Sequence, residues 1–154
     1  MRDDLNALPR PPTEGVRWVP PDQWHVTLAF MGDGDAEAVT AALDSMAADP
    51  ALAVVGPRVL RIGRRVVAAP VGGLGGLART VCSRLGADTD RPFLGHITLG
   101  RLRNDARCPL VGRPLAAVFD VNEVELVASV TAPSGARHSR LATYSLTGTG
   151  SADS

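Results

Sequence analysis

The sequence predicts an α+β fold in which mostly antiparallel strands carry helices on their outer side. Several short runs alternate apolar and polar residues, which is the period of a strand with one buried face. Two longer segments place apolar residues at helical spacing. The tripeptide pattern His-x-Thr occurs in two of the strand runs, and this indicates an internal duplication of a strand–helix unit.

The predicted strands are short and are separated by turns containing Gly or Pro. In the run from His25 to Phe30, Val26 and Leu28 face one side together with Phe30, while the histidine and Thr27 face the other. The same alternation places His96 and Thr98 on one face of a second run. The predicted strands cover residues 17–19, 25–30, 52–55, 59–62, 66–71, 96–99, 119–128 and 141–146.

Two helices are predicted from their apolar stripes and their end signals. The first begins after Asp35, a good N-cap residue, and ends before Pro50. The second covers residues 74–85 and ends at Gly86, a typical C-cap. The stripes are Val39, Leu43 and Met46 in the first helix and Leu74, Leu77, Val81 and Leu85 in the second.

Length and composition indicate one folded domain. The chain has 154 residues, of which 45% are hydrophobic and 21% charged, so a single domain over residues 1–147 with a loose tail at 148–154 is expected. The 16 basic residues are all Arg and balance 16 acidic residues. A neutral protein of this kind lacks the broad positive field of a bulk nucleic-acid binder, although one or two Arg side chains can hold a terminal phosphate.

The remaining sequence signals favour a cytoplasmic protein. Cys82 and Cys108 do not form a disulfide framework or a CxxC metal site. The first residues are acidic and interrupted by Pro, which is unlike a signal peptide. The longest apolar run is too short to span a bilayer. With three histidines and no acidic cluster beside them, we expect neither a metal nor a cofactor.

The two His-x-Thr segments are the pattern that carries chemistry. A single copy most often marks only a strand with a polar outer face. Here both copies continue with Leu, as His25-Val26-Thr27-Leu28 and His96-Ile97-Thr98-Leu99. If both strands border one cleft, two imidazoles act as acid and base while two hydroxyls donate to phosphate oxygens, which suits the hydrolysis of a phosphate ester.

The flanks of these segments resemble a known family. The stretches RWVPPDQWHVTLAFMGD and RPFLGHITLGR resemble the 2H phosphoesterase superfamily, and specifically its RNA 2′,3′-cyclic phosphodiesterase branch of the LigT type, formerly called 2′-5′ RNA ligase. The stretch FDVNEVELVASVTAPSGARHSRLATYSL is similar to the closing strands of that family. The resemblance covers nearly all of residues 15–147 and implies a two-lobed, duplicated fold around a central cleft.

The resemblance also implies roles for individual residues. His25 and His96 would be the catalytic pair, with His96 taken as the base although the sequence does not distinguish the two. Thr27 and Thr98 would hold the phosphate. Arg101 would assist at the phosphate or the nucleotide, the alternative being a solvated arginine that closes a strand.

Two further residues are possible substrate contacts. Phe93 could stack on a base, or it could belong to the core. His138 stands where the family often has Tyr after a Gly, and it either edges the cleft or lies in an exposed loop.

The chain departs from the family pattern at its beginning. Family members open with a strand and a helix, whereas residues 3–8 resemble only the end of that helix. We therefore expect the first strand and most of the first helix to be missing. An unpaired sheet edge would then lie beside the cleft, and the chain would be less stable and less active than its relatives.

The implied reaction is the hydrolysis of RNA 2′,3′-cyclic phosphate ends to 2′-phosphates without a metal. RNA ends or cyclic nucleotides would be the substrates, and no membrane or obligate protein partner is implied. One alternative is reversible 2′-5′ RNA ligation, or the opening of another cyclic nucleotide. Another alternative is a truncated protein that binds phosphate ends without catalysis.

Overall fold

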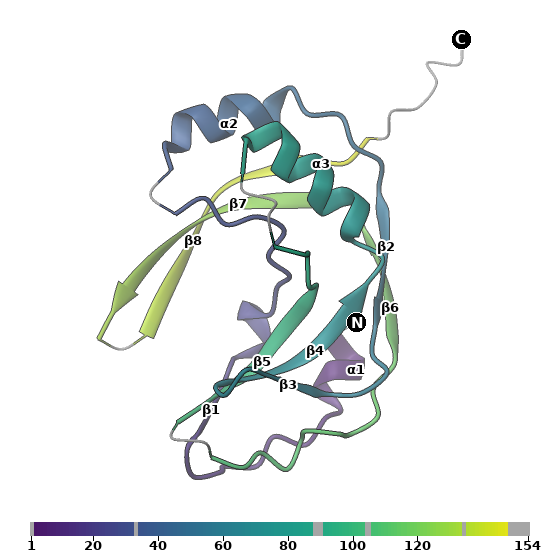
Figure 1. Cartoon of the computed structure of the whole chain (residues 1–154), viewed down its shortest axis with the longest axis vertical. Coiled ribbons are helices and arrows are strands. Elements are labelled where there is room, and N and C mark those ends of the chain that lie inside the picture. Colours follow the sequence, from purple (N-terminus) through teal and green to yellow (C-terminus); the bar gives the residue numbers. More distant parts are fainter. Residues whose placement is uncertain (1, 33, 88–90, 104–105, 134, 148–154) are drawn as a thin grey trace.

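The computed structural model describes residues 2–32, 34–87, 91–103, 106–133 and 135–147, and its elements form two lobes (Figure 1). One lobe is built on a six-stranded sheet, and the other contains two helices and a two-stranded sheet. The elements are α1 (Arg2–Asn6), β1 (Val16–Trp18), η1 (Pro21–Gln23), α2 (Ala36–Asp44), β2 (Ala51–Val55), β3 (Leu60–Ile62), β4 (Val66–Gly72), α3 (Gly75–Leu85), β5 (His96–Leu102), β6 (Ala117–Val121), β7 (Glu123–Ala132) and β8 (Gly135–Ser145).

The first lobe contains the larger core. Its strands lie in the order β1-β5-β4-β2-β6, with β3 also paired to β4, and every pairing is antiparallel. Alternate residues of these strands turn inward, which is why the strand patterns of the sequence are half apolar. The buried core residues of this sheet include Ala53, Val55, Val67, Ala69, Val71, Ile97, Leu99 and Leu102. The sheet thus has one face committed to packing and one free to present polar side chains.

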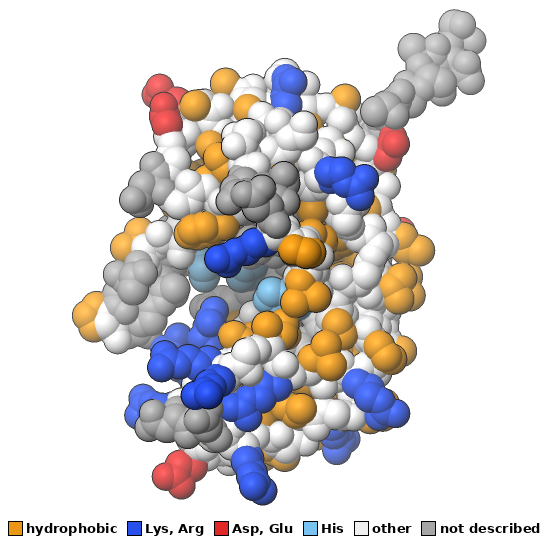
Figure 2. Space-filling view, in the orientation of Figure 1, with side chains coloured by type: hydrophobic (Ala, Val, Ile, Leu, Met, Phe, Trp, Pro, Cys, Tyr) orange, Lys and Arg blue, Asp and Glu red, His pale blue; other side chains and the backbone are white. Residues whose placement is uncertain are grey.

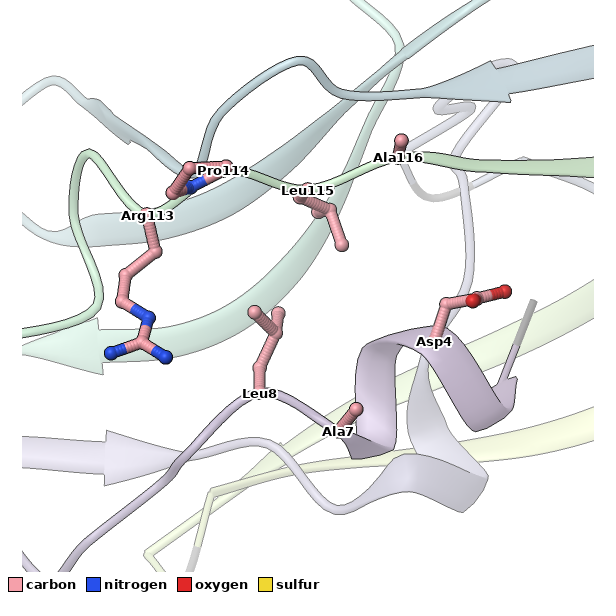
Figure 3. Close-up of a pocket in the computed structure, with 7 residues that line it drawn as sticks. All are labelled: Asp4, Ala7, Leu8, Arg113, Pro114, Leu115 and Ala116. Carbon is pink, nitrogen blue, oxygen red and sulfur yellow. The ribbon is translucent and has the colours of Figure 1, made fainter.

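The short helix α1 closes part of the first core. Leu5 in this helix is fully buried, and Leu8, which follows the helix, is 8% exposed. Both belong to that core. Figure 3 shows the pocket between this segment and the chain that leads into β6, where the side chains of Leu8 and Leu115 point toward one another. A five-residue helix is not stable alone, so packing against the sheet must hold it.

The second lobe is organised by α2, α3 and the β7–β8 pair. Asp35 caps α2 by accepting a hydrogen bond from the Glu37 backbone N–H at 3.0 Å. Gly86 ends α3 in the left-handed conformation, with φ of 65°. The second core consists of Ala48, Leu77, Val81, Val124 and Leu146. The prediction of an antiparallel α+β fold with two helices is confirmed, although α2 ends two residues before Met46.

The predicted strand over residues 25–30 is wrong beyond its first residues. Only Val26 pairs, in a single bridge with Ile97, and residues 27–32 form no helix or strand. Phe30, expected on the buried side, is 82% exposed. The alternation is present in the sequence, but beyond Val26 no strand in the described chain pairs with this segment. Leu28 still packs against the cores, whereas Phe30 remains uncovered.

Three other boundaries differ from the prediction. The expected strand 119–128 is divided at Asn122, because β6 pairs with β2 in the first lobe while β7 pairs with β8 in the second. β5 extends to Leu102, beyond the expected end at residue 99, and β8 begins at Gly135, before the expected start at residue 141. The expected tail at 148–154 lies outside the described residues. None of the helices in the described segments is long and apolar enough to cross a bilayer.

Candidate active site

The two His-x-Thr segments lie side by side and run in opposite directions. Val26 pairs with Ile97, which is 1% exposed and belongs to the first core, and Val26 packs against the same core. Residues adjacent to a core-facing residue in extended chain face the opposite side. His25 and Thr27 therefore share the outer face with His96 and Thr98, and continuing the register sets each histidine across from the other segment's threonine.

Each candidate histidine makes the same local hydrogen bond. The Nδ1 atom of His25 is 2.7 Å from the carbonyl oxygen of Gln23, and that of His96 is 2.9 Å from the carbonyl oxygen of Leu94. A carbonyl oxygen only accepts, so Nδ1 donates in both rings. In a neutral ring this leaves Nε2 as the acceptor, and Nε2 is the atom left to exchange a proton with a substrate. The equivalence of the two bonds is the local signature of the duplication.

The residues just before each histidine hold it in place. Trp24 is 6% exposed and donates from Nε1 to the carbonyl oxygen of Val19 at 3.1 Å, so the turn that leads into His25 is anchored in the core. Before His96, the Gly95 carbonyl accepts from the Val71 N–H at 2.8 Å. A Cβ at Gly95 would lie 2.4 Å from the Val71 carbonyl oxygen, so only glycine fits this close approach between strands.

A β-bulge in β5 turns Arg101 to the same face as the histidine. Thr98 pairs with Ala68 and Gly100 with Val67, which leaves Leu99 as the extra residue. Leu99 and Leu102 are both in the core, and Arg101 between them is exposed. Simple alternation would have put Arg101 on the side of Leu99. The bulge therefore decides that Arg101 accompanies His96 and Thr98.

Arg17 joins this face and was missed by the sequence analysis. It stands directly opposite Arg101 in the β1–β5 pair, and directly opposed residues project to the same side. It opens the stretch RWVPPDQWHVTLAFMGD that carries part of the family resemblance, but the resemblance was not used to give it a role. Its position opposite Arg101 depends on which strand pairs with β1, and that pairing is decided by the tertiary structure.

The two possible substrate contacts lie at different distances from this cluster. His138 is exposed, lies in β8 rather than in a loop, and contacts the ring of His25 with 5.5 Å between ring centroids and 60° between planes. Phe93 is 37% exposed and is not a core residue. Its ring instead lies within 3.3 Å of the position that a Cβ of Gly95 would take, next to His96 in the chain.

The surface around the histidines is basic. Figure 2 shows histidine side chains in a hollow near the middle of this face, with arginine side chains around it and the visible acidic side chains farther out. The pocket of Figure 3 is separate, because none of its lining residues belongs to the His-x-Thr segments. Within the described segments no three His, Cys, Asp or Glu side chains gather in a group that would hold a metal ion.

The sequence and the fold are both similar to those of known phosphoesterases. A sequence profile described as LigT like phosphoesterase matches residues 5–55. The apo crystal structure of E. coli LigT is 30% identical, with a TM-score of 0.75 over 95% of this chain and 90% of that one. The complex of E. coli LigT with 3′-AMP is 28% identical, with a TM-score of 0.73 over 95% and 91% of the two chains. The structure of TT0787 from Thermus thermophilus is 26% identical, with a TM-score of 0.71 over 96% and 90%.

The chain belongs to the LigT family of 2H phosphoesterases. A search of curated proteins finds no significant match. Membership in the LigT family makes the chain a phosphoesterase, and the LigT-like fold accounts for the two lobes.

Proposed function

We propose that this LigT-family phosphoesterase opens 2′,3′-cyclic phosphates at RNA ends to 2′-phosphates, with His25 and His96 as its acid–base pair. The observation that carries the proposal is the antiparallel contact of the two His-x-Thr segments at Val26 and Ile97. It brings two imidazoles to one face, each with Nδ1 already hydrogen-bonded to its own backbone. The Nε2 atoms of both rings are thereby left to exchange protons with the attacking and leaving oxygens of one phosphate group.

The proposed reaction is a single displacement at phosphorus. Neutral His96 takes a proton from water through Nε2, and the water oxygen bonds to phosphorus. The bond from phosphorus to the ribose O3′ breaks, and protonated His25 gives its proton to that oxygen, so that a hydroxyl leaves instead of an alkoxide. Thr27 and Thr98 donate hydrogen bonds to the non-bridging oxygens, where negative charge gathers. One 2′-phosphate and one 3′-hydroxyl result.

Ligands of related proteins support a nucleotide as the substrate. Crystal structures of E. coli LigT contain 3′-AMP and ATP. In 3′-AMP the phosphate is on the ribose 3′-oxygen, one of the two oxygens that a 2′,3′-cyclic phosphate joins. If a 5′-hydroxyl of another RNA replaced the water, the same groups would form a 2′-5′ linkage, so hydrolysis and ligation are two outcomes of one site.

The test is an assay on an RNA oligonucleotide that ends in a 2′,3′-cyclic phosphate, in the presence of EDTA. We expect the wild-type protein to form the 2′-phosphate, and His25→Ala and His96→Ala each to lose about 10²-fold or more in kcat, because each removes a proton-transfer group. His138→Ala is the matched histidine variant, and its loss should be smaller than either because a ring contact transfers no proton. Thermal melting of each variant separates chemistry from folding.

Two results would contradict the proposal. If the wild-type protein left the cyclic phosphate intact, the assigned reaction would be wrong, and the binding-only alternative would be favoured. If the product were the 3′-phosphate, the bond to O2′ would be the one that breaks, which reverses the assigned leaving group. An added RNA with a free 5′-hydroxyl would reveal ligation as a longer product.

A further inference from the structure

Arg17 and Arg101 are the third of three residue pairs that face one another along the same edge of β5. The register around Val26 and Ile97 sets His96 across from Thr27 and Thr98 across from His25. Farther along the same side of β5, β1 takes over the pairing and sets Arg101 across from Arg17. Residues on one face of a strand repeat about every 7 Å, so the arginine pair lies one such step or slightly more beyond the histidine–threonine pairs.

The orientation of Arg17 is determined by its neighbour Trp18. Trp18 pairs with Gly100, and a Cβ at Gly100 would lie 3.1 Å from Cε3 of the indole, so the ring lies tightly against that glycine. The indole Nε1 also donates to the carbonyl oxygen of Pro11 at 3.0 Å. Trp18 packs against the core. Arg17, the residue before it in the strand, must therefore point to the opposite face, where the histidines are.

Among the described residues, none is a partner of either guanidinium group. Both side chains are exposed, and neither makes a hydrogen bond or ion pair with any residue in the described part of the chain. Like charges directly opposite one another on two strands are destabilising. An anion between them would remove that repulsion, and a guanidinium fork matches the oxygens of a phosphate group better than any other basic side chain does.

We infer that this arginine pair binds a second phosphate of the substrate, the phosphodiester next to the reacting cyclic phosphate. The inference rests on the proposed function and extends it to substrate class. An RNA strand lying along β5 would set its terminal phosphate over the histidine–threonine pairs and its next phosphate over Arg17 and Arg101. Oligonucleotides would then be favoured over mononucleotides, which carry no second phosphate.

The experiment compares three cyclic phosphates in the wild-type protein and in two variants. The substrates are uridine 2′,3′-cyclic phosphate, the dinucleotide UpU ending in the same cyclic phosphate, and that dinucleotide with a neutral methylphosphonate between its two nucleosides. The variants are Arg17→Gln and Arg79→Gln. Arg79 lies exposed on α3 in the other lobe and matches the charge change.

The expected result is a selective loss at the second phosphate. In the wild-type protein, kcat/KM for UpU should exceed that for the mononucleotide by about tenfold or more, as charge-assisted hydrogen bonds allow. The methylphosphonate should remove most of this advantage, and Arg17→Gln should remove it for UpU but cause no further loss with the methylphosphonate. Arg79→Gln should keep the wild-type ratio. The methylphosphonate comparison needs no variant and so does not depend on folding.

Each other outcome has a separate meaning. If Arg17→Gln lowered kcat/KM equally for mononucleotide and dinucleotide, the pair would act on the reacting phosphate and the inference would be overturned. If neither the methylphosphonate nor the variant changed the ratio, the pair would bind no phosphate. If the wild-type protein opened none of the three substrates, the proposed function itself would be wrong, and this inference with it.

Discussion

Each candidate histidine is positioned by residues that adjoin it in the chain. Trp24 anchors the turn before His25, and Gly95 allows β5 to approach β4 just before His96. At this scale the alternation in the sequence was sufficient to put His25 with Thr27 and His96 with Thr98 on one face. It could not show the matching Nδ1 bonds, because a ring orientation depends on backbone turns that the pattern does not encode.

Replacing Gly95 tests how closely the site depends on its local packing. Gly95→Ala adds a Cβ 2.4 Å from the Val71 carbonyl oxygen, so β4 and β5 must separate next to His96. We expect a loss of stability of about 1–3 kcal/mol and a fall in kcat of about tenfold or more, because small displacements of a catalytic group are costly. Urea unfolding and the cyclic phosphate assay measure the two effects.

The matched glycine variant is Gly76→Ala. A Cβ there meets nothing within 4 Å, and the residue lies in α3, where alanine is favoured over glycine by about 1 kcal/mol. It should raise the unfolding midpoint and leave kcat unchanged. If Gly95→Ala behaved in the same way, the close approach to Val71 would have no importance for the site.

Among the elements, β5 shows how an irregularity selects a functional side chain. Its bulge at Leu99 keeps Leu99 and Leu102 in the core and turns Arg101 outward between them. Strict alternation from His96 would have assigned Arg101 to the buried side. The helices were more predictable, since a cap residue and an apolar stripe are both local signals. α2 begins directly after Asp35 and α3 ends at Leu85 as expected, although α2 ends at Asp44, before Met46 of its expected stripe.

The ends of α2 provide a test of that local control. The Asp35 side chain accepts from the Glu37 N–H, and Asp35→Ala should cost about 1 kcal/mol of stability. Asp44 is the last residue of the same helix, where a negative charge opposes the helix dipole. Asp44→Ala should therefore be neutral or slightly stabilising. Equal destabilisation by both variants, measured by urea unfolding, would show that Asp35 does not act as a cap.

At the scale of the whole molecule, two separate cores hold the two lobes, and the histidine face belongs to the sheet of the first. The first core includes Leu5 from α1, a helix of five residues that the sequence presented only as the remnant of a longer one. Full burial of Leu5 makes this segment a structural part of the first lobe. The lobe that carries His96 therefore depends on residues far earlier in the chain.

Truncating Leu5 measures that dependence. Leu5→Ala leaves a cavity in a fully buried position and should cost about 2–5 kcal/mol. The matched variant is at Leu52 in β2 of the first lobe, which is 52% exposed. Leu52→Ala should cost less than about 1 kcal/mol. Midpoints of urea unfolding give both values. A small effect at Leu5 would mean that α1 does not contribute to the first core in solution.

The sequence by itself determined the strand and helix periods, the helix ends, and the doubled His-x-Thr pattern with its family resemblance, because these depend on residues close together in the chain. Only the tertiary structure decided that Arg17 faces Arg101, that His138 contacts His25, and that Phe30 stays exposed. These depend on which strands pair and in what register. Pairing is settled by the summed packing of distant segments, and no local pattern contains that sum.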